Sequence, residues 1–157
     1  MPIDPRRFLQ AVAILGAISA YVTIVLGGTV RGMGAGLACP DWPLCNGSVV
    51  PDFADTGIFV EYVHRLVAAL TGMFMLSTLV AAVVWFRSEM RIVTLSVMSF
   101  AILVTQVAVG ALTITSENDW AVVTIHLALG TATLASALIV ALVSLWPARA
   151  VTGSATT

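Results

Sequence analysis

The charged residues of this chain fall in clumps, and long apolar stretches lie between them. Four stretches contain no Asp, Glu or Arg, and they are 23, 21, 25 and 29 residues long: 8–30, 66–86, 92–116 and 120–148. A helix needs about 20 apolar residues to cross a bilayer, and it must satisfy its own backbone there. The pattern therefore predicts four transmembrane helices, at about 8–30, 58–86, 92–116 and 120–147.

The composition agrees with a membrane protein. Of 157 residues, 59% are hydrophobic and only 10% are charged, whereas soluble domains carry roughly 25% charged residues. The net charge is −1, and the lack of a basic excess excludes a nucleic-acid-binding protein. We expect an all-α integral membrane four-helix bundle over residues 1–149. The small, polar residues 150–157 predict a disordered tail.

The arginines mark one side of the predicted bundle. Five of them flank the start of the first helix, the connection between the second and third helices, and the end of the fourth: Arg6, Arg7, Arg87, Arg91 and Arg149. The opposite side is acidic and has Arg31 as its one arginine between helices. Because cytoplasmic loops carry an excess of Arg and Lys, both termini are predicted to be cytoplasmic. We expect a multi-pass protein of a prokaryotic-type plasma membrane.

The long outer loop at about 31–57 contains both cysteines of the chain. Glycines and prolines interrupt any regular helix in this loop. Cys39 and Cys45 have five residues between them and lie on the oxidising side, so we expect them to form a disulfide. Such a bridge either stiffens the loop or exchanges electrons with a substrate or partner.

A weak internal repeat relates the two halves of the chain. Gly27 and Gly28 near the end of the first helix correspond to Gly110 in the third, and His64 in the second helix corresponds to His126 in the fourth. The repeat predicts two helical hairpins in tandem, related by a pseudo-twofold axis along the membrane normal.

The two histidines are the candidate metal ligands. Each lies six residues into its predicted helix, which is about 9 Å at 1.5 Å per residue, so both have the same depth. Two imidazoles on facing helices are a usual axial pair for haem, and Gly27, Gly28 and Gly110 would leave room for a porphyrin. Alternatively, the histidines only hydrogen-bond between helices, but ionisable groups within the membrane are by default functional.

Glu61 and Arg65 lie near His64 in sequence. Glu61 is three residues before the histidine and shares its helix face, and Arg65 follows Glu61 by four residues. In one interpretation the two form a plain ion pair. In the other, Arg65 and Arg31 neutralise haem propionates, and Glu61 is free to act as acid, base or electrostatic stabiliser.

The motifs together resemble the heme A synthase family over about residues 20–135. The resemblance rests on five segments in order: 27–31 (GGTVR), 39–45 (CPDWPLC), 61–65 (EYVHR), 105–111 (TQVAVGA) and His126. Members of that family oxidise a methyl group of heme O to the formyl group of heme A through successive hydroxylations, with water as the oxygen source. The resemblance implies that His64 and His126 are haem ligands and that Glu61 is the catalytic carboxylate.

The resemblance also implies the cofactors and partners. Family members commonly have two four-helix halves, one with a haem b cofactor and one with the substrate heme O, and this chain has the length of one half. Either copies associate so that separate subunits hold cofactor and substrate, or one site serves both in turn; we expect the first, a homo-oligomer in the lipid bilayer. A heme O-producing farnesyltransferase and a terminal oxidase are the expected protein partners, and nucleic acid is not expected to bind.

Two other classes of function share some of these features. A quinone-coupled thiol-disulfide oxidoreductase also displays cysteines in an outer loop, but it generally needs a second cysteine pair, which this sequence lacks. A non-catalytic b-type cytochrome or membrane anchor explains the histidines, but it leaves Glu61 and the loop motif unexplained.

Overall fold

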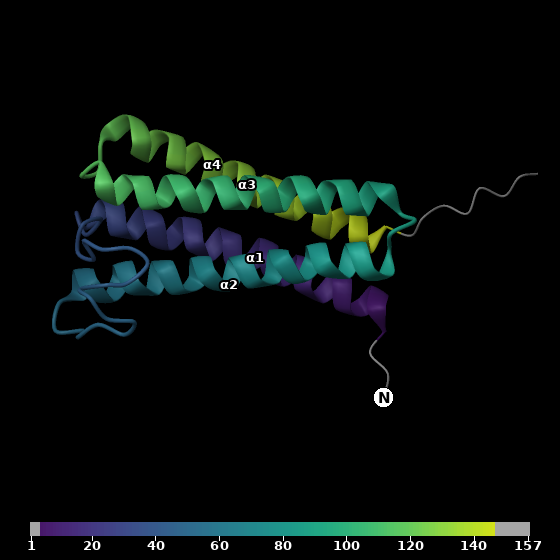
Figure 1. The fold of residues 1–157 in the computed structure, drawn as a ribbon, viewed down its shortest axis with the longest axis horizontal. Helices are drawn as coiled ribbons and strands as arrows, with labels where there is room; N and C mark the ends of the chain where they lie inside the picture. Colours follow the sequence, from purple (N-terminus) through teal and green to yellow (C-terminus); the bar gives the residue numbers. More distant parts are fainter. Residues whose placement is uncertain (1–3, 147–157) are drawn as a thin grey trace, which may run out of the picture.

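The computed structural model describes residues 4–146 as four long helices joined by one long loop and two short turns (Figure 1). The helices are α1 (Pro5–Gly32), α2 (Thr56–Trp85), α3 (Met90–Thr115) and α4 (Trp120–Leu145). The tail expected at 150–157 lies outside the described residues. The predicted all-α four-helix membrane bundle is confirmed, and the predicted helix ends differ from the observed ones by at most three residues.

Aspartates define where three of the helices begin. The side chains of Asp4, Asp55 and Asp119 accept hydrogen bonds from backbone N–H groups in the first turns of α1, α2 and α4. These N–H groups have no partner within the helix, so a capping carboxylate stabilises the first turn. One of these aspartates, Asp119, also borders an uncharged stretch, so the same charge that interrupts the apolar sequence starts α4.

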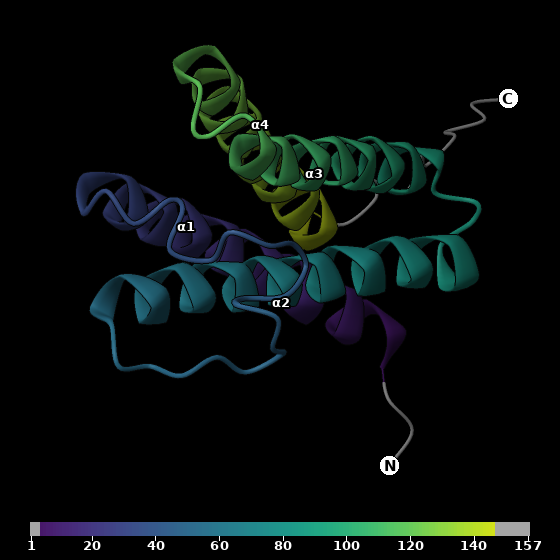
Figure 2. The ribbon, with the colours of Figure 1, turned by 60° about the vertical axis from the view of Figure 1, so that its left-hand side comes forward.

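The chain forms two helical hairpins, α1–α2 and α3–α4, with α1 also packed against α4 (Figure 2). Hydroxyl pairs join the helices within each hairpin: Ser19 with Thr71 over 2.8 Å in the first, and Ser99 with Ser136 over 2.9 Å in the second. In an apolar environment such interhelical hydrogen bonds and small side chains hold helices together. We call the end with the 33–55 loop the loop end, and the opposite end the terminal end.

All four helices are long and apolar enough to cross a membrane, and much of their large apolar surface is exposed. Clusters of buried apolar side chains lie in the middle and at the terminal end of the bundle. Leu9, Ala82 and Ile92 pack together near the terminal end, and Ala17 and Met75 lie in a cluster nearer the middle. The loop end is packed differently, and the histidines lie there.

Candidate functional site

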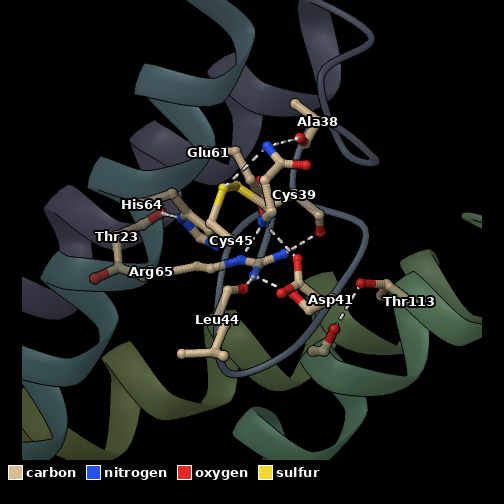
Figure 3. Close-up of polar contacts among 12 residues, drawn as sticks. Thr23, Ala38, Cys39, Asp41, Leu44, Cys45, Glu61, His64, Arg65 and Thr113 are labelled. Atoms are coloured by element: carbon tan, nitrogen blue, oxygen red, sulfur yellow. Dashed lines mark hydrogen bonds and ion pairs between the residues drawn. A yellow bond between two sulfur atoms is a disulfide. The ribbon is translucent and has the colours of Figure 1, made fainter. Parts of the chain in front are cut away.

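The two histidines lie in the loop-end half of the bundle, His64 on α2 and His126 on α4. Nδ1 of His64 is 3.1 Å from the carbonyl oxygen of Thr23 on α1 (Figure 3). Because a carbonyl only accepts, Nδ1 carries the hydrogen, and Nε2 is left with a free lone pair for a metal. Nδ1 of His126 is buried without a hydrogen-bond partner among the described residues, and the backbone of Gln106 lies nearby.

A glycine from the neighbouring helix lies against each imidazole. A Cβ on Gly27 of α1 would be 3.0 Å from Cε1 of His64, and a Cβ on Gly110 of α3 would be 2.9 Å from Cε1 of His126. The sequence repeat thus corresponds to a repeated contact, glycine against histidine within each hairpin. Gly28 has no neighbour within 4 Å of an added Cβ, so of the three glycines it alone borders open space.

Adding a methyl group at either contact glycine should displace the histidine. If the histidines bind haem, we expect Gly27→Ala and Gly110→Ala each to lower the affinity for haem about tenfold, within the 10–100-fold range found for groups that orient a metal ligand. Haem per protein and the reduced-minus-oxidised spectrum measure the effect. Gly72→Ala is the matched control, because its added Cβ would lie 4.0 Å from the nearest side chain. Unchanged haem in both contact variants would contradict this role.

The helices are less buried at the depth of the histidines than in the middle of the bundle. None of residues 21–29, 62–70, 104–115 and 120–129 is buried, although all four segments belong to the helices. A native interior is normally close-packed. A large apolar group bound between the hairpins would bury more of these residues, and two imidazoles with a nitrogen available on each ring are the donor set that a haem iron takes.

Glu61 is buried next to this region, one turn before His64 on α2. The residue is 6% exposed, and its Oε1 accepts a hydrogen bond of 2.9 Å from Nε of Arg65. The ion pair considered from the sequence is therefore present. Arg31 is exposed at the end of α1, so the two arginines considered as propionate anchors have different surroundings.

The predicted disulfide between Cys39 and Cys45 is present. Cys39 is 0% exposed and Cys45 is 2% exposed, whereas a disulfide that exchanges with a partner must be reached by an attacking thiolate. Three backbone carbonyls of the loop closed by this bridge accept hydrogen bonds from Arg65 (Figure 3). The arrangement favours the stiffening role for the bridge over thiol exchange.

Asp41 stabilises the turn that follows Cys45 in the loop. Its carboxylate accepts hydrogen bonds from the backbone N–H groups of Gly47 over 2.8 Å and Asn46 over 2.6 Å. These bonds hold the pKa of Asp41 below its ordinary value of 3.8, and the bond from Gly47 has the largest effect. Since they favour the ionised form, they stabilise the turn while the carboxylate is charged.

The turn at Asp41 is therefore expected to loosen in acid. The folded pKa lies below the unfolded one, so the stabilisation is complete above the unfolded pKa of about 4 and is lost as pH falls through the folded pKa. Amide hydrogen exchange at Asn46 and Gly47, corrected for the intrinsic rate, should accelerate below about pH 4. Asp41→Asn should remove this pH dependence, and an unchanged pH profile in that variant would contradict the assignment.

Sequence reasoning missed the groups that surround the two imidazoles. Thr23 precedes Gly27 by four residues, and Gln106 precedes Gly110 by four residues. Extending the glycine repeat by one helical turn could have found both. The contact between Arg65 and the loop carbonyls has no comparable sequence signal. Every residue has a backbone carbonyl, so residue type does not indicate which carbonyls accept a hydrogen bond.

A family model described as cytochrome oxidase assembly protein (COX15-CtaA) matches residues 10–58 and 52–156 of the chain. The chain belongs to the cytochrome oxidase assembly protein family. The heme A synthase of Bacillus mycoides strain KBAB4 is 30% identical over 137 residues, which are 85% of this chain and 43% of that protein. Those of Bacillus cereus strain AH187 and Bacillus anthracis strain A0248 are 29% identical with the same coverage.

The similarity to heme A synthases, expected from the motifs, is thus confirmed for this member of the cytochrome oxidase assembly protein family. The chain spans less than half the length of the curated relatives it matches. No solved structure matches it.

Proposed function

We propose that this chain binds haem between His64 and His126 and converts the methyl group of heme O to the formyl group of heme A. The observation that carries the proposal is the pair of imidazoles, each set against a glycine of its own hairpin, at a depth where the neighbouring helix residues are only partly buried. The buried carboxylate of Glu61, three residues from His64, supplies the acid–base group that the reaction needs. The family and the heme A synthase relatives support the same assignment.

The residues have separate roles in this reaction. The haem iron supplies the redox chemistry when it is bound. His64 and His126 would hold the iron, and the Thr23 carbonyl fixes the His64 ring through Nδ1. Net conversion of the methyl to the formyl group takes up one water oxygen and releases four electrons and four protons, so a separate electron acceptor must take the electrons one at a time. Glu61 would accept a proton from that water or stabilise positive charge on the reacting carbon.

We also propose how copies of the chain cooperate in the membrane. One pair of histidines holds one bis-histidine haem, so a haem b cofactor and a heme O substrate need two sets of ligands. A second copy of the chain would supply the second set, giving a homo-oligomer in the plasma membrane with the loop end outside. A farnesyltransferase would provide heme O, and a terminal oxidase would receive heme A.

Supplying heme O to membranes that contain the protein tests the function directly. Haems are extracted over time and identified by mass, in ordinary water and in ¹⁸O-labelled water. We expect the hydroxylated and formyl haems to appear with oxygen from water. Bound haem with unchanged heme O would instead identify a non-catalytic b-type cytochrome, and absence of any bound haem would contradict both functions.

A further inference from the structure

The guanidinium of Arg65 lies where the disulfide loop meets α2 (Figure 3). Its Nε donates to Oε1 of Glu61 over 2.9 Å. Its Nη1 donates to the carbonyl oxygens of Asp41 and Leu44, and its Nη2 donates to that of Cys39, each over 2.7 Å. A guanidinium has five N–H donors, and four of them are therefore used within this one cluster.

The three carbonyls belong to the closed loop, residues 39–45 joined at their ends by the disulfide. Closing a short loop removes most of its conformational freedom, so the carbonyl oxygens can converge on one cation at little further entropic cost. Opening the bridge would free the loop, and the three acceptors would no longer be held together around Arg65.

Burial makes Glu61 dependent on this arrangement. The side chain of Arg65 is 14% exposed and that of Glu61 is 8% exposed. Charge-assisted hydrogen bonds are short and strong in such surroundings, and removing one partner leaves a buried charge uncompensated. The closed loop holds Arg65, and Arg65 in turn holds the carboxylate beside His64.

We propose that Arg65 is a positioning residue that couples the Cys39–Cys45 loop to the Glu61 carboxylate. The disulfide then supports the reaction through hydrogen bonds, without passing electrons to the substrate. The inference rests on the proposed function, because it assigns Glu61 a part in that chemistry. With four donors already used, Arg65 is poorly suited to bind a haem propionate as well.

A double-mutant cycle in the full chain tests this coupling. The variants are Arg65→Lys, Cys39→Ser with Cys45→Ser, and all three changes together. Lysine keeps the charge but has no planar fork to bridge a carboxylate and three carbonyls. Each parent variant should lower kcat for heme O conversion about 10–100-fold, with KM and bound haem unchanged, and the triple variant should be no slower than the slower parent.

The control is Arg87→Lys, the same change at an exposed arginine at the terminal end, which should leave kcat unchanged. Losses that multiply in the triple variant would show that the cysteines act independently of Arg65. Full activity of Arg65→Lys would also overturn the proposal.

A second measurement does not depend on activity. Amide exchange across residues 39–48 and the rate at which dithiothreitol reduces the disulfide should both rise about tenfold in Arg65→Lys, because lysine lacks the planar fork of donors that holds the three loop carbonyls together. If wild-type protein converts no heme O but these rates rise, the proposed function fails while the link between Arg65 and the loop stands. If both rates equal those of the wild type, the link itself is absent and the proposal is overturned.

Discussion

Replacing His64 or His126 with alanine is expected to remove most of the haem from the purified protein. In the proposed function each ring would supply one of two ligands from opposite hairpins, so a single remaining imidazole would hold the iron from one side only. The affinity for haem should fall by more than the roughly 10–100-fold that is typical when a group hydrogen-bonded to a metal ligand is removed. Haem per protein and the reduced-minus-oxidised spectrum measure it, and added imidazole should restore part of the binding in either variant.

Matched controls separate loss of a ligand from general damage to the helices. Leu66→Ala on α2 and Ile125→Ala on α4 shorten side chains that are 48% and 54% exposed, close in sequence to the histidines. These variants should keep the wild-type haem content and spectrum. If either histidine variant also keeps both, the iron is not held by this pair.

The helices could be predicted closely because one physical requirement governs them. A membrane helix must be long and nearly free of charge, and the residues that end the apolar stretches include Asp119, which also caps α4. The start of α2 was placed two residues late, because Thr56 and Gly57 read as loop until the carboxylate of Asp55 is seen to cap them. Such small errors at helix ends are usual.

The sequence singled out the residues of the candidate site, but it did not predict most of the contacts between them. Gly27 and Gly110 were chosen as space for a porphyrin, whereas the structure sets them directly against the imidazoles. The sequence shows that a glycine leaves space at the depth of the histidines. It does not show which neighbouring side chain occupies that space. Arg65 is similar, because its spacing from Glu61 predicts an ion pair but carries no information on the loop carbonyls.

Glu61→Gln is expected to leave haem binding unchanged and to lower the rate of heme O conversion by about 100-fold or more. Glutamine has nearly the same shape and can still accept the hydrogen bond from Nε of Arg65 through its carbonyl oxygen. It can neither take a proton from water nor balance a positive charge, and losses of 10²–10⁴-fold are typical when a general acid or base is removed. Mass analysis of extracted haems should show heme O accumulating.

The control for the charge is Glu117→Gln, the same change at an exposed residue at the loop end, which should convert heme O at the wild-type rate. Glu61→Asp adds a graded test, because it keeps the charge but withdraws the carboxylate by one methylene. Its rate should fall between those of the wild type and Glu61→Gln if position and charge both matter. Normal heme A formation in Glu61→Gln would contradict the catalytic role, and the buried carboxylate would then serve only to hold Arg65 beneath the disulfide loop.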